Sequence, residues 1–134
     1  MTRSKGILFD LSCDEALRFD GEKEDFDEVL GNLIDNAGKW AESRVMVTAT
    51  ALESEGENRS LMEILVEDDG PGVPDSDLDA LFERGRRLDE RVPGTGLGLA
   101  IVRDIVEMYG GQARLERSEL GGLAAILRLP AKEY

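Results

Sequence analysis

The stretch GNLIDNAGKW, residues 31–40, places Asn32 and Asn36 one helical turn apart and Lys39 one further turn along. Spacings of four and three residues put all three on one side of an α-helix. Amide oxygens suit Mg²⁺, which prefers an octahedral oxygen shell completed by phosphates and water, and a lysine can meet a phosphate as a point charge. The simpler interpretation is a solvated polar stripe on an amphipathic helix, because asparagine is common on protein surfaces.

The rest of the fold follows outward from this helix, whose apolar residues recur at helical spacing over residues 25–41. A second helix is predicted over residues 97–109, ended by two glycines, and a short helical piece near residues 77–82. Short apolar runs bounded by turn formers predict strands over residues 6–12, 17–19, 43–52, 61–67, 112–117 and 123–129. This order predicts an α/β two-layer sandwich, in which about three helices cover one face of a mixed sheet of about five strands.

Composition limits the function. A length of 134 residues predicts a single domain over residues 1–134. Sixteen basic and 29 acidic residues give a net charge of −13, which argues against nucleic acid and anionic membranes as partners. No apolar stretch approaches the ~18 residues needed to span a bilayer. With no histidine and one cysteine, Cys13, the chain has no metal site of the Cys/His kind and no internal disulfide, which fits a reducing compartment.

A second motif, DDGPGV at residues 68–73, directly follows a predicted strand. Two carboxylates there, Asp68 and Asp69, place an acceptor at the edge of the sheet that could take a hydrogen bond from the exocyclic amino group of adenine, while Gly70 and Gly72 allow the ring to approach closely. Val73 closes the motif. Because Asp-Gly and Pro-Gly are also turn dipeptides, a simple tight turn is the alternative.

A third motif, GTGLGL, lies immediately before the second predicted helix. Unsatisfied N–H groups and the helix dipole attract phosphate to such a position. A glycine-rich fingerprint is a weak signal alone, and a dinucleotide-binding motif would instead join the first strand to the first helix. The candidate phosphate-binding residues are Gly94, Thr95, Gly96, Leu97, Gly98 and Leu99.

The connection between these two motifs is long and carries basic residues. Residues 70–96 lack a strong apolar period, and a connection of this length is usually functional, such as a lid. Its arginines could match phosphate oxygens with their guanidinium forks, or form weak surface pairs with nearby acidic residues. The four arginines are Arg84, Arg86, Arg87 and Arg91.

The three motifs, in this order and with an arginine-bearing lid between the last two, resemble the catalytic ATP-binding domain of sensor histidine kinases. These belong to the Bergerat-fold (GHKL) superfamily with gyrase, MutL and heat-shock chaperone ATPases. The resemblance covers residues 6–130, and the lid sequence FERGRR with VPGTGLGLA is similar to that of PhoQ-type kinases. It implies ATP and Mg²⁺ as cofactors, with Asn32 and Asn36 toward Mg²⁺ and phosphate, Lys39 near the phosphates and Trp40 flanking the nucleotide.

The resemblance also assigns the remaining motifs. Asp68, with Gly70 and Gly72, becomes the first glycine box and accepts from the adenine amino group. Phe82 anchors the F box, and Arg87 is the lid residue expected to meet the γ-phosphate. The second glycine box, with its amides around the phosphates, is Gly94, Thr95, Gly96, Leu97, Gly98 and Leu99.

The family resemblance separates phosphoryl transfer from hydrolysis. Superfamily members that hydrolyse ATP carry a glutamate four residues before the metal-binding asparagine, as general base for water. Here that position is Asn32, which cannot take a proton at neutral pH. The expected activity is therefore γ-phosphoryl transfer to an external nucleophile, with a Bergerat-fold ATPase or a non-catalytic nucleotide-responsive module as alternatives.

The absence of histidine implies that the acceptor lies elsewhere. By the resemblance, it belongs to a separate dimerisation domain of the same full-length kinase, which in turn serves a downstream response regulator. The chain is expected to be a monomer by itself and the cytoplasmic part of an inner-membrane-bound bacterial kinase.

Overall fold

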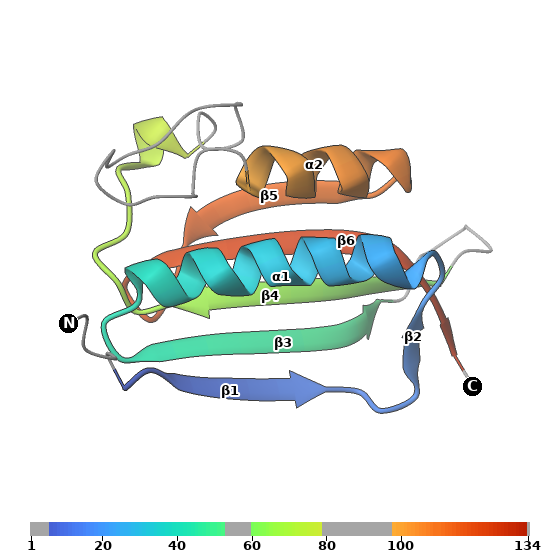
Figure 1. The fold of residues 1–134 in the computed structure, drawn as a ribbon, viewed down its shortest axis with the longest axis horizontal. Coiled ribbons are helices and arrows are strands. Elements are labelled where there is room, and N and C mark those ends of the chain that lie inside the picture. Colours follow the sequence, from blue (N-terminus) through green and yellow to red (C-terminus); the bar gives the residue numbers. More distant parts are fainter. Residues whose placement is uncertain (1–5, 53–59, 79–97, 134) are drawn as a thin grey trace.

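The structure, a computed structural model, describes residues 6–52, 60–78 and 98–133. Within these ranges the chain forms one mixed sheet, and two α-helices lie side by side across one of its faces (Figure 1). The helices are α1 (Lys23–Trp40) and α2 (Gly98–Met108), with a 3-10 helix η1 (Asp75–Asp77). The strands are β1 (Leu8–Cys13), β2 (Leu17–Phe19), β3 (Arg44–Leu52), β4 (Leu61–Asp68), β5 (Gln112–Arg117) and β6 (Leu123–Glu133).

The sheet has the order β1-β3-β4-β6, with β5 on the other edge of β6 and β2 on the last residues of β6. β1 and β3 are parallel and every other described pair is antiparallel. The predicted two-layer α/β sandwich with a mixed sheet is therefore confirmed. In place of about three helices, the described ranges hold two α-helices and η1, and the end of the predicted piece at residues 77–82 lies outside them.

Alternation along the strands builds the core. Successive strand residues point to opposite faces, so that one set packs under the helices. On β4 this buried set is Met62, Ile64, Val66 and Asp68. Apolar residues of α1 and α2 close the core from the other side, among them Val29, Leu33, Val102 and Val106. Full burial of each such side chain contributes about 1.5–3 kcal/mol.

Helix α1 begins slightly earlier and ends slightly earlier than predicted, at Lys23 and Trp40. Glu24 and Asp25 in its first turn interact favourably with the helix dipole. At the same end of the sandwich, the Tyr109 hydroxyl donates to the Asp25 carboxylate at 2.5 Å and accepts from the backbone N–H of Glu22 at 3.0 Å. This contact joins the end of α2 to the start of α1.

Strand β6 runs to Glu133, four residues beyond the predicted end. Pro130 stands at the last position of the β4 pairing, opposite Leu61, where β6 passes from β4 to β2. Ala131–Glu133 then pair with β2. No helix in the described ranges is long and apolar enough to cross a membrane.

Candidate functional site

The predicted site residues that the structure describes come from the second half of α1, the end of β4 and the start of α2. α1 and β4 end at the same end of the sandwich, and α2 begins on the side nearer to it (Figure 1). The turn between β5 and β6 joins them, because the Gly122 N–H donates to the Asp68 carbonyl at 3.1 Å. Motifs far apart in the sequence therefore come together here.

Asn32 lies between the two helices. Its side-chain N–H donates to the Glu28 carbonyl at 2.9 Å, one turn earlier in α1. Its oxygen faces the first residue of α2, since a Cβ built at Gly98 would lie 3.2 Å from Asn32 Oδ1. The side chain thus directs an oxygen, a suitable ligand for a hard cation, toward a glycine-bearing helix N-terminus, which favours a phosphate group.

Asn36 and Lys39 continue the same face of α1, and both are half-buried. Lys39 Nζ pairs with the Asp35 carboxylate at 3.2 Å, and the Asp35 side chain is 66% exposed. An i,i+4 pair of this kind contributes little. A phosphate could therefore replace Asp35 as a partner of Lys39.

Asp68 is a buried carboxylate, only 2% exposed. Its Oδ1 accepts from the Gly70 N–H at 2.9 Å and from the Leu123 N–H at 3.4 Å. Burial raises the pKa of this carboxyl above its ordinary value, although the two backbone hydrogen bonds oppose the shift. A carboxylate that is buried at a cost to folding is typical of a functional site.

Glycines surround Asp68 where side chains would collide with it or with its neighbours. A Cβ at Gly70 would lie 2.2 Å from the Trp40 carbonyl oxygen, and one at Gly122 would lie 2.0 Å from Asp68 Oδ1. Gly72 has a φ of +72°, in the left-handed region that favours glycine. The backbones of three elements thus pack directly around one acceptor. Gly122 was not among the predicted site residues, and the Gly-Gly pair in its hairpin was the available signal.

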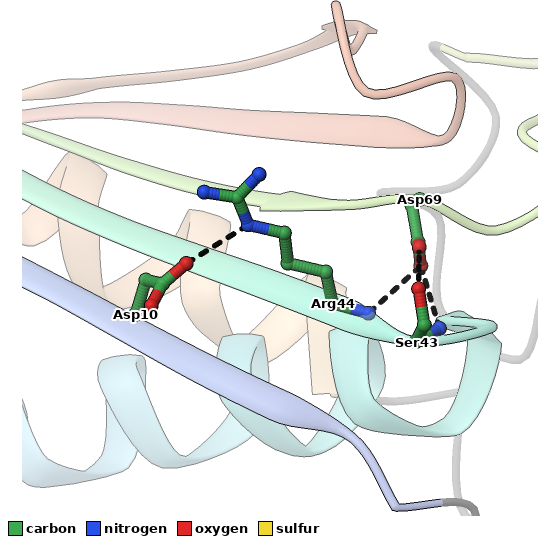
Figure 2. A network of polar contacts seen from close by, with 4 residues as sticks. All are labelled: Asp10, Ser43, Arg44 and Asp69. Atoms are coloured by element: carbon green, nitrogen blue, oxygen red, sulfur yellow. Dashed lines mark hydrogen bonds and ion pairs between the residues drawn. The ribbon is translucent and has the colours of Figure 1, made fainter.

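Asp69 points away from Asp68 and was also missed by the sequence interpretation. Its Oδ1 accepts from the backbone N–H groups of Glu42, Ser43 and Arg44, at 2.9, 3.0 and 3.1 Å; the last two residues are drawn in Figure 2. Its Oδ2 accepts from the Ser43 hydroxyl at 2.5 Å. The Ser43 hydroxyl, followed by these backbone donors, holds the pKa of Asp69 well below its usual range. The strand alternation that buries Asp68 was the signal that could have separated the two aspartates.

The remaining predicted residues divide into two groups. Val73 packs against the core, and the Leu99 side chain is buried within it, so Leu99 can contribute to a site mainly through its backbone. The other positions lie outside the described residues, and their roles stay predictions. They are Phe82, Arg87, Gly94, Thr95, Gly96 and Leu97.

This fold is that of a known family. Residues 21–133 match the family model of the histidine kinase-, DNA gyrase B- and HSP90-like ATPases, and the chain belongs to that family. The chain is 47% identical over 122 residues to the sensor protein kinase CarS of Pseudomonas aeruginosa, a match covering 91% of this chain and 26% of CarS. It is 41% identical over 118 residues to the virulence sensor histidine kinase PhoQ of Salmonella typhimurium, covering 88% and 23%. The chain thus spans about a quarter of the length of these relatives.

Solved structures of sensor histidine kinases have the same fold. The mycobacterial sensor histidine kinase MprB superimposes with a TM-score of 0.83 at 28% identity, over 98% of this chain and 86% of that one. Full-length ShkA in complex with AMPPNP superimposes with a TM-score of 0.79 at 28% identity, over 97% of this chain and 27% of ShkA. The expected resemblance to sensor histidine kinases and the Bergerat fold are both confirmed. The chain is a histidine kinase-type ATPase domain.

Proposed function

We propose that this chain binds ATP with Mg²⁺ and donates the γ-phosphoryl group to a histidine on a separate dimerisation domain. The observation that carries the proposal is that the chain presents two different groups, one around Asp68 and one between Asn32 and the start of α2. Asp68 is a buried acceptor enclosed by positions that admit only glycine, and Asn32 directs an oxygen toward the start of α2. The Asp68 group suits the base of a nucleotide, and the Asn32 group suits its metal-bound phosphates.

The adenine side of the site consists of Asp68 and its glycines. Asp68 would accept a hydrogen bond from the exocyclic amino group through a carboxylate oxygen. Gly70 and Gly122 keep side chains away from this acceptor. The half-buried Trp40 would flank the nucleotide.

The phosphate side consists of the polar face of α1. Asn32 and Asn36 would hold the metal ion with their amide oxygens, and Asn32 is already oriented by its bond to the Glu28 carbonyl. Lys39 would leave Asp35 for a phosphate oxygen. Bound Mg²⁺ would neutralise charge on the phosphates. The proposal includes Arg87 and the glycines at residues 94–98 as further phosphate contacts.

Transfer is favoured over hydrolysis because the chain has asparagine at position 32, where hydrolysing relatives are expected to have a glutamate. An amide cannot accept a proton from water at neutral pH. Since the chain contains no histidine, the acceptor belongs to another part of the full-length kinase. We place this domain on the cytoplasmic side of a bacterial inner membrane, as a monomer by itself, upstream of a response regulator.

Calorimetric titration with a non-hydrolysable ATP analogue, with and without Mg²⁺, tests the binding step. The wild-type chain is expected to show saturable binding that Mg²⁺ strengthens. Asp68→Ala should weaken binding about tenfold or more under both conditions, because it removes a charged acceptor. Asn36→Ala should remove most of the gain that Mg²⁺ gives. Glu63→Gln, on the other face of the sheet, is the control and should bind like wild type. A folded wild-type chain that does not bind overturns the proposal.

A further inference from the structure

Three consecutive backbone N–H groups, those of Glu42, Ser43 and Arg44, converge on one carboxylate oxygen of Asp69. Figure 2 shows the bonds from Ser43 and Arg44. Successive amides arranged in this way form a concave anion-binding site, known as a nest. The Ser43 hydroxyl adds a fourth donor to the other carboxylate oxygen. The anion that fills this nest is a side chain of the protein itself.

The nest lies in the connection between α1 and β3. Ala41 caps the helix by donating its N–H to the Ala37 carbonyl at 2.8 Å, and its side chain is fully buried. The donors to Asp69 follow immediately. Asp69 therefore holds the backbone that fixes where the last turn of α1, with Lys39 and Trp40, can lie.

The neighbours of Asp69 in the chain have different tasks. On one side, Asp68 is the buried acceptor of the site. On the other side, Gly70 lies directly against the Trp40 carbonyl, with no room for a Cβ. Three consecutive residues thus provide the acceptor, the anchor to the α1–β3 connection, and the contact with α1.

We propose that Asp69 is a positioning residue of the nucleotide site, which sets the distance between Asp68 and the asparagine-bearing face of α1 so that one nucleotide reaches both. This inference rests on the proposed function. A ligand held at two ends binds well only when both ends are already correctly spaced. Loss of Asp69 should therefore weaken binding that uses both Asp68 and the asparagines of α1 more than it weakens binding through either of them alone.

The same polar network contains a natural control. The Arg44 side chain turns the other way and its Nε pairs with the Asp10 carboxylate of β1 at 2.8 Å (Figure 2). Both side chains of this pair are more than 40% exposed, and such pairs contribute little. Asp10→Asn removes this ion pair and leaves the nest intact.

The test compares Asp69→Asn, Ser43→Ala and Asp10→Asn with wild type, at a temperature where circular dichroism shows each chain folded. The readouts are the affinity for a non-hydrolysable ATP analogue with and without Mg²⁺, and the emission spectrum of Trp40, the single tryptophan. Asp69→Asn should reduce the Mg²⁺-dependent gain in affinity about tenfold, as expected for a residue that orients ligand-binding groups. Affinity without Mg²⁺ should change much less, and the Trp40 spectrum should shift. Asp10→Asn should match wild type in all readouts.

Ser43→Ala removes one donor and leaves the carboxylate, so it should show a smaller effect in the same direction and covers the case in which Asp69→Asn does not fold. The inference is wrong if the folded variants keep the full Mg²⁺ gain, or lose affinity equally with and without Mg²⁺. In that case wild-type binding and its loss in Asp68→Ala still support the proposed function. A wild-type chain that binds no analogue overturns the proposed function and this inference together.

Discussion

Gly70 lies directly against the backbone carbonyl of Trp40, so closely that a Cβ at position 70 would be 2.2 Å from the oxygen. This contact joins the turn after β4 to the last turn of α1, and hence the candidate base acceptor to the candidate metal helix. Position 70 requires glycine, because a side chain there would collide with the Trp40 carbonyl.

Gly70→Ala should destabilise the domain by about 1–3 kcal/mol, the usual cost of forcing extra atoms into a packed region. Gly31 provides the matched control, because it lies on exposed α1 surface with open space around its Cα. Gly31→Ala should raise the free energy of unfolding by up to about 1 kcal/mol through helix propensity. Chemical denaturation measures both. Equal effects of the two substitutions would count against the contact.

Asp68→Asn should separate stability from binding. The burial that raises the pKa of Asp68 means that ionisation there opposes folding. The folded pKa lies above the unfolded one, so the favourable contribution of protonated Asp68 is present at low pH and is lost as pH rises through the folded pKa. Asp68→Asn should therefore be more stable than wild type at neutral pH, and this difference should shrink in acid.

The same variant should bind the ATP analogue more weakly, because the charged acceptor is gone. Thermal unfolding at pH 7 and at pH 4, beside calorimetric titration at pH 7, checks both halves. A variant that is less stable than wild type at pH 7 would show that the ionised carboxylate stabilises the fold.

Asp69 should produce the opposite pH dependence. The Ser43 hydroxyl and the backbone donors hold its pKa well below the usual range. Its contribution to stability is therefore fully present above the ordinary aspartate pKa of about 3.9, and is lost as pH falls further toward the folded pKa. Below about pH 4, wild type should lose free energy of unfolding more steeply than Asp69→Asn. Ser43→Ala, which removes the largest cause of the shift, should fall between them in urea denaturation. Parallel curves for all three chains would contradict this assignment.

Tyr109→Phe should lower the melting temperature and leave nucleotide affinity unchanged. The variant loses the hydroxyl that bridges the Asp25 carboxylate and the Glu22 N–H, while its ring keeps the edge-on contact with Phe19. This cluster joins the start of α1 to the end of α2, at the opposite ends of both helices from the candidate site. Thermal unfolding and titration of the same preparation provide the check. Weaker nucleotide binding by the folded variant would show that the two ends are coupled.

Local pattern predicted most of the fold. The apolar LMEILVE stretch predicted β4 to within one residue, and the helical spacing of apolar residues predicted α1 to within two residues at each end. The sequence could not show that β6 lies between β4 and β5, because pairing between distant strands is decided by the assembled core. The continuation of β6 past Pro130 likewise depends on β2, which is more than a hundred residues earlier in the chain.

The site divides in the same way. Asn32, Asp68 and Gly98 were predicted from motifs whose chemistry is local, and the structure places Asn32 beside Gly98 at the start of α2. Asp69 was missed because its partners lie 25 to 27 residues earlier. Gly122 was missed because it has no functional group of its own: it matters only because a side chain there would collide with the carboxylate oxygen of Asp68.

The proposed activity is transfer of a phosphoryl group to a separate acceptor. The direct test incubates this chain with Mg²⁺ and ATP labelled in the γ-phosphate, alone and with the purified histidine-bearing dimerisation domain of the same full-length kinase. We expect label on the dimerisation domain only when both proteins are present, and no transfer by Asn36→Ala. Label on this chain alone, or rapid release of inorganic phosphate without the acceptor, would contradict it.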